Sequence, residues 1–393
     1  MDELDRQLGK CVRCGACKSI CPTYLETMNE TLGARGRVAM LGALQNNILE
    51  PTPALAEKIF SCMLCGACRG KCPTGIDIPE MIYRGRSTLV DFYGRSKMLK
   101  RVLKKSSMKM DNLFSVLRKC QRLMYGTLFR AGKVGYVPEI SSEPFHRSVQ
   151  VYKNSKKIGR VAIYGGCSVN YFYPRLGHAL VRILLSKGYE VVVFKGELCC
   201  GAPIRSMGLE QEAVSLARKN IEHFNKVRAE AVISMCPTCT HVFRDQYPLM
   251  TGDSVENIKD VNEFFLENGI AEGLEISPAR MTFHDPCHLG YGLGIKSEPR
   301  AILGQVRGIE LHEMRHPENC CGFAGLFSLQ YREMSDRIAE RKMQDIAGTA
   351  AETVVTSCPG CIMQLEGLAA SSGSEVKVRH IVEILDEAMH PEG

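Results

Sequence analysis

The sequence predicts an α+β protein of several domains, in which an α-helical N-terminal domain precedes two repeated α/β domains with parallel sheets. Three observations lead to this fold class. The chain has 393 residues, enough for two or three domains. Two similar cysteine runs with helical patterns between them lie near the N-terminus. A longer pattern of cysteines, β-rich runs and helices occurs twice in the remainder, and such a repeat determines the architecture.

The expected domain boundaries follow changes in composition. The first cysteine runs give way to a Lys- and Arg-rich stretch, and the β-rich runs begin after it. We therefore expect four segments: an α-helical domain at 1–95, a basic helical connector at 96–157, a first cysteine-rich repeat at 158–277 and a second at 278–393.

The two N-terminal runs both read C-x2-C-x2-C-x3-C-P, which is the run of bacterial two-cluster ferredoxins. Three closely spaced thiolates hold one cubane [4Fe-4S] cluster, and the fourth, next to the proline, binds the other cluster. The run therefore predicts two cubane clusters with crossed ligands. The first has Cys11, Cys14, Cys17 and Cys72, and the second has Cys62, Cys65, Cys68 and Cys21. Two four-cysteine zinc sites are the alternative.

About forty residues separate the two runs, and they read as helical. One helix is expected over 35–44 and another over 54–60, with prolines between them. A ferredoxin domain with such an insertion is predominantly α-helical. For Arg35 and Arg37 on the first of these helices, we expect a position facing solvent rather than a partner.

The positive charge of the chain is local. Residues 95–133 contain 12 Lys and Arg against one acid, Asp111, so this segment carries +11 while the whole chain carries +7. A basic amphipathic helix over 113–128 would dock on an acidic partner or an anionic membrane, or serve as an ordinary connector. For Cys120, which has no cysteine neighbour, we expect a buried structural thiol.

From residue 159 onwards, short β-rich runs alternate with helical patterns. The first copy has strands expected at 161–164, 189–194 and 231–235, with helices at 176–186 and 210–226; the second has strands at 281–284, 309–314 and 353–356. Each copy closes with a similar helix, at 261–266 and 381–386. This alternation indicates parallel βαβ units, in which ligands bind at the carboxyl ends of strands.

Most cysteines of the repeats follow directly after an expected strand. The five of the first copy recur 120 to 122 residues later: Cys167, Cys199, Cys200, Cys236 and Cys239, then Cys287, Cys320, Cys321, Cys358 and Cys361. Five thiolates are one more than a tetrahedral zinc or a cubane cluster uses. The set suits a larger or opened iron–sulfur cluster in which one sulfur bridges two irons. Zinc held by four of the five is the alternative.

Several other classes of site and location are disfavoured. The first residues are acidic without an apolar run, so we expect no signal peptide and no disulfide framework. No apolar stretch is long enough to cross a membrane, and we expect a cytoplasmic protein that reaches the membrane only through a partner. No nucleotide or flavin fingerprint is found, so hydride chemistry would belong to another chain. The localised charge gives no reason to expect nucleic acid as a partner.

These motifs together resemble the iron–sulfur subunit of glycolate oxidase and the related D subunit of heterodisulfide reductase. The resemblance extends over essentially the whole chain; beside the two Cys-Cys-Gly repeats, its most specific parts are Cys11–Tyr24, Gly33–Arg37, Cys62–Gly75 and His284–Leu289. Glycolate oxidase subunits often have degraded repeats, whereas both repeats here keep all five cysteines, as in heterodisulfide reductases. The stretches Gly33–Arg37 and Arg379–Glu383 are instead similar to the glycolate oxidase group.

The resemblance implies an oxidoreductase subunit that carries electrons. As in glycolate oxidase, it would pass electrons from an FAD-containing dehydrogenase subunit, which oxidises glycolate or lactate, to a membrane cytochrome b or another acceptor. Heterodisulfide reductase implies one or two non-cubane [4Fe-4S] clusters in the repeats, with a disulfide cleaved between them. Cys200 and Cys321, the second members of each Cys-Cys pair, would then be catalytic. We expect the first function and keep the second as the alternative.

Overall fold

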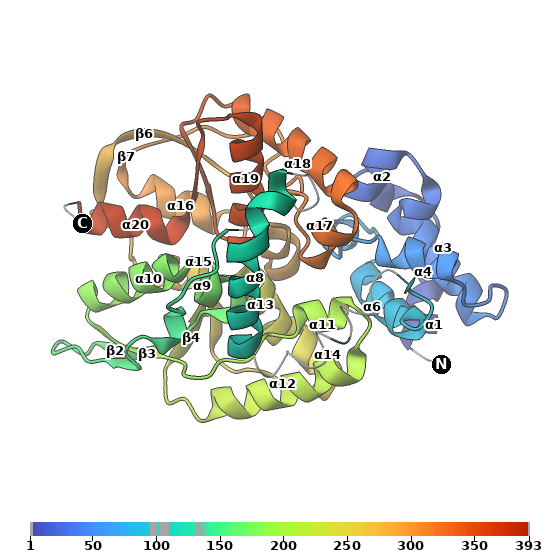
Figure 1. The fold of residues 1–393 in the computed structure, drawn as a ribbon, viewed down its shortest axis with the longest axis horizontal. Coiled ribbons are helices and arrows are strands. Elements are labelled where there is room, and N and C mark those ends of the chain that lie inside the picture. The colour runs from blue at the N-terminus through green and yellow to red at the C-terminus, as the bar shows by residue number, and fades with distance from the viewer. Residues whose placement is uncertain (1–2, 95–100, 102–109, 131–135, 137, 392–393) are drawn as a thin grey trace.

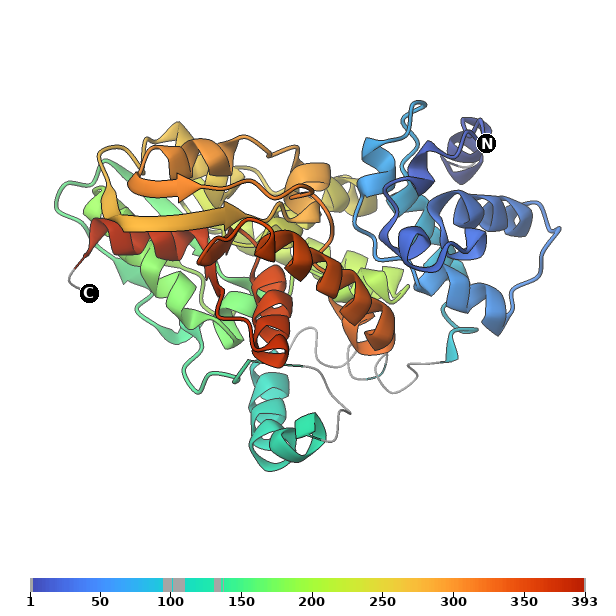
Figure 2. The same cartoon turned by 90° about the horizontal axis from the view of Figure 1, so that it is seen from above.

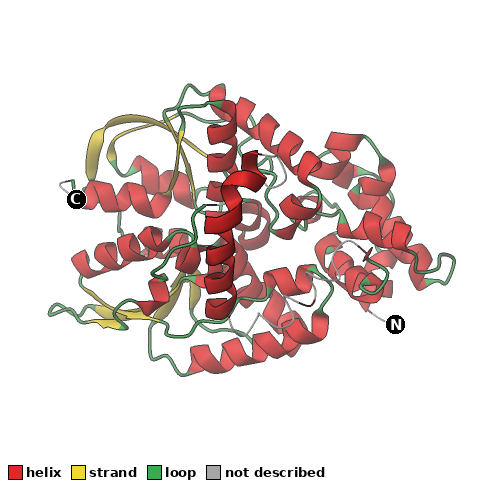
Figure 3. Cartoon of the chain, in the orientation of Figure 1, coloured by secondary structure: helices red, strands yellow, loops and turns green. Residues whose placement is uncertain are grey.

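The computed structural model describes residues 3–94, 101, 110–130, 136 and 138–391. Figure 1 shows three parts: N-terminal helices on one side and two layered α/β units beside them, one above the other. Figure 3 shows that the strands lie in the two α/β units, away from the N-terminal helices. A long helix, α8, crosses in front of both units.

The N-terminal part contains short helices packed around a small core. They are α1 (Glu3–Gly9), η1 (Ala16–Lys18), α2 (Pro22–Thr27), η2 (Glu30–Leu32), α3 (Ala34–Gln45), α4 (Pro53–Phe60), α5 (Ala67–Gly70) and α6 (Ile78–Leu89). The helices expected at 35–44 and 54–60 are confirmed as α3 and α4. Helix α4 begins after Thr52, whose side chain accepts the N–H of Leu55, and Pro53 needs no such partner.

The first α/β unit is built on a five-stranded sheet with the order β1-β3-β2-β4-β5. Its strands are β1 (Val151–Tyr152), β2 (Gly159–Tyr164), β3 (Tyr189–Val193), β4 (Ala231–Ser234) and β5 (Ile258–Asp260). All neighbours are parallel except β1, which pairs antiparallel with β3. Strand β2 is buried on both faces, so Val161 and Ile163 enter one core while Ala162 and Tyr164 enter another.

The second unit repeats this topology without the extra edge strand. Its fully parallel sheet has the order β7-β6-β8-β9, which is the order β3-β2-β4-β5 of the first unit. The strands are β6 (Glu275–Phe283), β7 (Arg307–Leu311), β8 (Thr353–Thr356) and β9 (Lys377–His380). The prediction of parallel βαβ units in both repeats is therefore confirmed.

Helices connect the strands and cover the sheets in both units. The first unit has α9 (Gly166–Tyr171), α10 (Pro174–Ser186), α11 (Ala202–Ser206), α12 (Glu210–Asn225), α13 (Pro237–His241), η5 (Val242–Gln246), α14 (Tyr247–Thr251) and α15 (Val261–Glu267). The second has η6 (His288–Leu293), α16 (Glu298–Gly304), α17 (Leu326–Gln330), α18 (Arg332–Ala347), α19 (Pro359–Ser372) and α20 (Ile381–Met389). The two expected closing helices are thus confirmed as α15 and α20.

One hydrophobic core is shared by the two units. It contains buried residues from the first repeat, such as Val161 and Ile183, together with Phe283 and Ile384 from the second. Helices α10 and α20 pack against each other between the two sheets (Figure 1). Because the units bury apolar surface against each other, their relative position is held by the same packing that stabilises each sheet.

The connector differs from the prediction in two ways. Helix α8 (Met110–Arg130) is present, and Figure 2 shows it standing out from the body of the molecule. Cys120 is exposed on this helix, so the expectation of a buried structural thiol is wrong. The connector also supplies β1, a strand that was not anticipated. Residues 95–100, 102–109 and 131–133 of the basic segment lie outside the described residues.

Candidate metal centres

The five cysteines of the first repeat lie together at the carboxyl ends of its strands. Their order of contact is Cys167, Cys199, Cys200, Cys239 and Cys236, each side chain touching the next. These residues form the first repeat set, and its members come from the turns after β2, β3 and β4. Parallel strands end at the same edge of a sheet, which explains why residues so distant in sequence meet.

The second repeat set has the same arrangement. Its order of contact is Cys287, Cys320, Cys321, Cys361 and Cys358. The Sγ atoms of Cys321 and Cys361 lie 3.2 Å apart. Both sets are almost entirely buried, with only Cys167 and Cys287 partly exposed.

The two repeat sets meet at one pair of residues, Cys236 and Cys358, whose side chains are in contact. Both residues stand directly before a helix, α13 and α19, that begins with proline. The ten cysteines of the repeats therefore form one uninterrupted row of contacting thiols. Sequence analysis anticipated two sites, and it had no signal for this junction.

Reciprocal hydrogen bonds hold the junction in place. Ser357, the residue before Cys358, donates its hydroxyl to Asn262 of the first repeat at 3.0 Å. In the other direction, the His380 ring of the second repeat lies 3.1 Å from the carbonyl oxygen of Met235, the residue before Cys236. All four of these residues are buried. Each repeat therefore positions the cysteine turn of the other.

Contacts between thiols divide their pKa values into low and high. The pKa of Cys200 falls to about 6 because Cys199 donates a hydrogen bond to it, and that of Cys358 falls to about 5 through Cys236. The donors show the opposite effect, and the hydrogen bond to Cys200 raises the pKa of Cys239. Buried thiols so close together ionise only in part on their own. Bound metal cations would allow all five to become thiolates.

Glycines shape the backbone around the sulfur atoms. Gly201 and Gly322, which follow the two Cys-Cys pairs, have φ values of +95° and +91°, a region that residues with side chains rarely adopt. In this conformation their N–H groups donate to Cys199 and Cys320, each at 3.4 Å from sulfur. Gly166 has φ +62°, and a Cβ atom there would lie 3.2 Å from the sulfur of Cys239. The space beside the sulfurs thus depends on glycine.

A buried carboxylate missed by sequence analysis holds the turn before Cys167. Glu197 accepts N–H groups from Gly165 at 2.9 Å and Gly166 at 2.8 Å, and the side-chain amide of Asn170 at 2.7 Å. Burial raises the pKa of Glu197 to about 7. Only its position two residues before Cys199 could have drawn attention to it.

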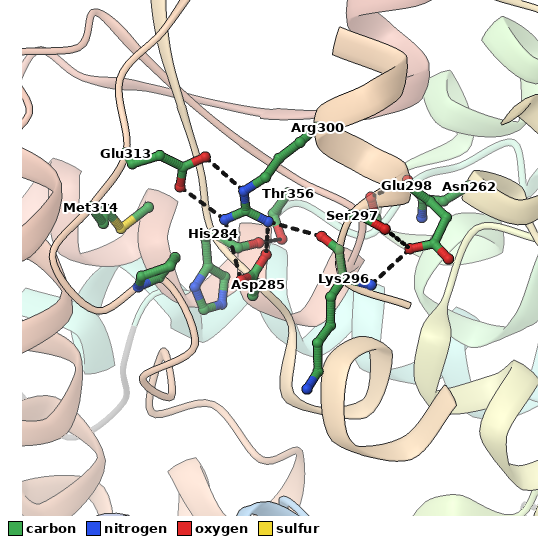
Figure 4. A network of polar contacts seen from close by, with 12 residues as sticks. Asn262, His284, Asp285, Lys296, Ser297, Glu298, Arg300, Glu313, Met314 and Thr356 are labelled. Carbon is green, nitrogen blue, oxygen red and sulfur yellow. Dashed lines mark hydrogen bonds and ion pairs between the residues drawn. The ribbon is translucent and has the colours of Figure 1, made fainter. Parts of the chain in front are cut away.

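The second repeat holds the equivalent turn with an ion-pair network, shown in Figure 4. The guanidinium of Arg300 donates to Asp285 at 2.8 Å and to Glu313 at 2.6 Å. Thr356 donates its hydroxyl to the carbonyl oxygen of His284. These contacts fix the His284–Cys287 turn between β6, β8 and α16.

His284 is the strongest candidate ligand or hydrogen-bond donor beyond the cysteines. It is 1% exposed, and neither ring nitrogen has a hydrogen-bond partner among the described residues. A ring nitrogen and the sulfurs of Cys321 and Cys361 all lie within 4.8 Å of one another. At the matching position of the first repeat, Tyr164 donates instead to the carbonyl oxygen of Leu198. The two repeat sets therefore have different surroundings.

The N-terminal cysteines lie in two groups. Cys21, Cys62, Cys65 and Cys68 line one cavity, and this group is called the inner set. The outer set consists of Cys11, Cys14, Cys17 and Cys72. Burial raises the pKa of Cys17 to about 11, and the charges of Cys21, Cys11 and Cys72 act in the same direction. Cys14 is exposed. Cys21 thus lies with the cysteines of the other run, the position that crossed ligation requires.

The inner set continues into the repeats. Cys65 lines a cavity together with Cys287 and Cys320, and the charge of Cys287 raises the pKa of Cys65 further above the value set by burial. On the other side, Cys68 lies close enough to Cys17 for their charges to interact. The four sets therefore follow one another in space: outer, inner, second repeat, first repeat.

All four sets suit iron–sulfur clusters by the chemistry of their donors. Every ligand is a soft thiolate, which favours iron–sulfur clusters or zinc over hard cations. The sulfurs are buried and receive backbone N–H groups, and hydrogen bonds of this kind adjust cluster potentials. The residues therefore fit the expected clusters.

One sequence prediction about this region is wrong. Arg37 is 1% exposed and lines the cavity of the inner set, although we expected it to face solvent. Its neighbour Arg35 is partly exposed and pairs with Glu30 at 2.7 Å. The helical pattern shows which faces of α3 differ, but the packing of α4 and α6 decides what each face meets.

Family models match most of the motif-bearing regions. A 4Fe-4S dicluster domain matches residues 7–76, and a cysteine-rich domain matches twice, at 161–244 and 281–366. The chain is 28% identical to the probable glycolate oxidase iron-sulfur subunit of Bacillus subtilis (strain 168), over 99% of this chain and 95% of the relative. It is 26% identical to a fumarate reductase (CoM/CoB) component, the B subunit, of Methanothermobacter marburgensis, over 98% and 73%.

A third relative corresponds to the repeats. Lactate utilization protein A of an Exiguobacterium species is 30% identical over 58% of this chain and 98% of its own length. Among solved structures, a hypothetical protein from Helicobacter pylori has the same fold, with a TM-score of 0.58 at 12% identity, covering 100% of this chain and 74% of that one. The chain belongs to the family of iron–sulfur proteins that join a 4Fe-4S dicluster domain to two cysteine-rich domains, and it is related to oxidoreductase subunits.

Proposed function

We propose that this chain is the iron–sulfur electron-transfer subunit of a flavin-linked 2-hydroxyacid dehydrogenase. It would take electrons from an FAD-containing subunit that oxidises glycolate or lactate and pass them to a respiratory or other acceptor. The observation that carries this proposal is the spatial order of the four cysteine sets, which extends from exposed Cys14 to the buried first repeat set. A relative named for glycolate oxidase matches nearly the whole chain and supports it.

The protein residues would perform three tasks in this function. The cysteines hold the clusters in a fixed order, and bound clusters supply one-electron transfer. The backbone N–H groups of Gly201 and Gly322 bond to sulfur and stabilise added negative charge there. Burial keeps water away from all but the outer set, so the surface near Cys14 is where electrons would leave or enter.

The test combines the chain with its flavin partner under anaerobic conditions. With the partner and glycolate or lactate, the visible absorption of the clusters should bleach and signals of reduced clusters should appear by electron paramagnetic resonance (EPR). The isolated chain should not oxidise either acid, because iron–sulfur clusters do not accept hydride. Bleaching by the hydroxy acid without any flavin partner would contradict the proposal.

A second function is favoured by one specific observation, the contact between Cys236 and Cys358. Two complete repeat sets that touch could cleave a disulfide between them, as the resemblance to heterodisulfide reductase implies. One relative is named for a fumarate reductase (CoM/CoB). In this alternative, Cys200 and Cys321 are the catalytic positions.

Thiol release distinguishes the two functions. The dithionite-reduced chain is mixed with a low-molecular-weight aliphatic disulfide, and free thiols are counted. Rapid release that is lost in Cys200→Ala and in Cys321→Ala, but kept in Cys120→Ala, would establish the second function. Cys120 is a suitable control because it is exposed and outside both repeat sets. No release, with cluster reduction by partner and hydroxy acid, supports the first.

We also propose that the basic segment, residues 95–133, docks on an acidic partner subunit or a membrane surface, because +11 of charge is concentrated there. Among the helices that the structure describes, none combines the length and the hydropathy needed to cross a bilayer. Reversing Lys100, Arg101, Lys104 and Lys105 to Glu should weaken association, as should added salt. Unchanged pull-down and membrane fractionation would contradict this.

A further inference from the structure

Two arginines are buried beside the inner set with no acid to pair with. Arg37 on α3 is 1% exposed and Arg86 on α6 is 4% exposed. Among the described residues, neither forms an ion pair with Asp or Glu, and each lies close enough to affect the other's charge. Two unpaired like charges in a protein interior are unusual, because each costs several kcal/mol of desolvation.

The hydrogen bonds of Arg37 are all to neutral groups. Its guanidinium donates to the carbonyl oxygen of Lys58 at 2.8 Å, the hydroxyl of Thr23 at 3.1 Å and the hydroxyl of Ser61 at 3.0 Å. Thr23 in turn lies 3.4 Å from the sulfur of Cys21, an inner-set residue. The side chain of Arg37 therefore reaches the inner set both directly, as a wall of its cavity, and through Thr23.

The hydrogen bonds of Arg86 are all to backbone carbonyl oxygens. It donates to Phe60 at 2.9 Å, to Ser206 at 2.7 Å and, by a short contact, to Cys62 of the inner set. Its guanidinium also lies over the Phe60 ring, 5.2 Å from the centroid. Burial lowers the pKa of Arg86, and the negative charge of Cys62 opposes this effect.

Capping of α4 explains only part of this arrangement. The carbonyl oxygens of Lys58, Phe60 and Cys62 lie at or just after the C-terminal end of α4, where cations are favourable. A helix end offers about half of one negative charge, however, against two full positive charges. The missing counter-charge lies next to both guanidinium groups, because four thiolates holding an iron–sulfur cluster carry net negative charge.

The outer set has no equivalent. Its nearby cations, Lys18 and Arg35, share the carboxylate of Glu30 at 2.9 Å and 2.7 Å. All three side chains are partly exposed, so water screens them further. The two N-terminal sets are thus alike in sequence and different in charge.

We propose that Arg37 and Arg86 are the counter-charges of the inner cluster and hold its reduction potential above that of the outer cluster. Reduction adds one electron and one negative charge, without a proton, and a buried cation stabilises that added charge more than an exposed, paired one does. An electron shared between the two would then rest on the inner cluster, next to the second repeat set. This proposal depends on the clusters of the proposed function, but not on the identity of the flavin partner.

The test is a potentiometric titration of the anaerobic holoprotein with dithionite and mediators, followed by EPR. In Arg37→Gln, the ratio of reduced to oxidised inner cluster should fall at least tenfold at a fixed potential, equivalent to about 59 mV for one electron. Arg37→Lys keeps the charge and should retain most of the parent value. The matched control is Arg35→Gln on the same helix, which should leave the inner cluster unchanged. An unchanged inner cluster in Arg37→Gln would overturn the proposal.

A second measurement covers the case in which Arg37→Gln does not assemble its cluster. Cys14→Ser replaces an outer-set ligand and therefore marks which EPR signal belongs to the outer cluster. In the parent protein, the unmarked cubane signal should then appear first as the potential is lowered. The opposite order would overturn the proposal. Because dithionite is the reductant, this result is independent of whether a hydroxy acid and flavin partner reduce the protein.

Discussion

The stability of the first repeat should depend on pH through one buried carboxyl group, Asp260. It caps helix α15: one oxygen accepts the backbone N–H of Asn262 at 3.0 Å and its side-chain amide. The other oxygen is buried without a hydrogen-bond partner among the described residues. Burial raises the pKa of Asp260 from its ordinary value of 3.8 to about 7.

The sign and size of the effect follow from this difference. The folded state binds the proton more tightly than the unfolded state, so the stability from Asp260 is complete below pH 3.8 and falls as the pH rises towards about 7. A difference of roughly three pH units corresponds to about 4 kcal/mol at about 1.4 kcal/mol for each. Between pH 5 and pH 8, about 3 kcal/mol of this loss should be seen.

Asp260→Asn removes the titration and keeps the cap, because an amide oxygen accepts the same N–H groups. Anaerobic unfolding at constant ionic strength should show the variant gaining stability relative to the parent as the pH rises from 5 to 8. Asp253→Asn changes the same charge at an exposed position and should run parallel to the parent. If the curves of Asp260→Asn and the parent are also parallel, the carboxyl is not protonated in the folded protein and the reasoning fails.

Three further predictions concern the clusters. Anaerobically purified protein should contain on the order of sixteen irons per chain, from two cubane and two repeat sites; half that iron with two zincs would exclude clusters from the repeats. Cys72→Ser should damage the outer cluster and Cys21→Ser the inner one, by EPR, whereas loss of each run's own cluster would refute crossed ligation. Ser357→Ala leaves Asn262 without its donor, so it should cost about 1–3 kcal/mol in unfolding and disturb both repeat sites. A spectral change confined to the second repeat site would contradict that coupling.

The strands of the repeats were predictable because short β-branched runs buried on both faces are distinctive. The strand at 353–356 is correct to the residue, and the cysteines after such strands follow from parallel sheet geometry. By contrast, β6 begins at Glu275, six residues earlier than expected, since its first residues are largely exposed and carry no buried pattern. Local patterns therefore located the sites well and the exposed strand ends poorly.

Features that depend on contacts between distant elements were out of reach. The burial of Arg37 depends on α4 and α6 closing over α3, and the exposure of Cys120 on what α8 packs against. Likewise, the contact of Cys236 with Cys358 requires the relative position of two repeats, which no pattern within either one contains. Helical periodicity separates the faces of a helix but does not say which neighbour each face will have.

The reciprocal bonds at the junction have a consequence for how this protein could have diverged. Asn262 serves the turn of Cys358, and His380 serves the turn of Cys236, so the two copies cannot be separated without each losing a support. Yet the supports are chemically unlike, an amide in one direction and an imidazole in the other. Duplication made the halves equal, and exchange of these contacts made them interdependent. Each copy was then free to specialise only in ways that its twin could still support.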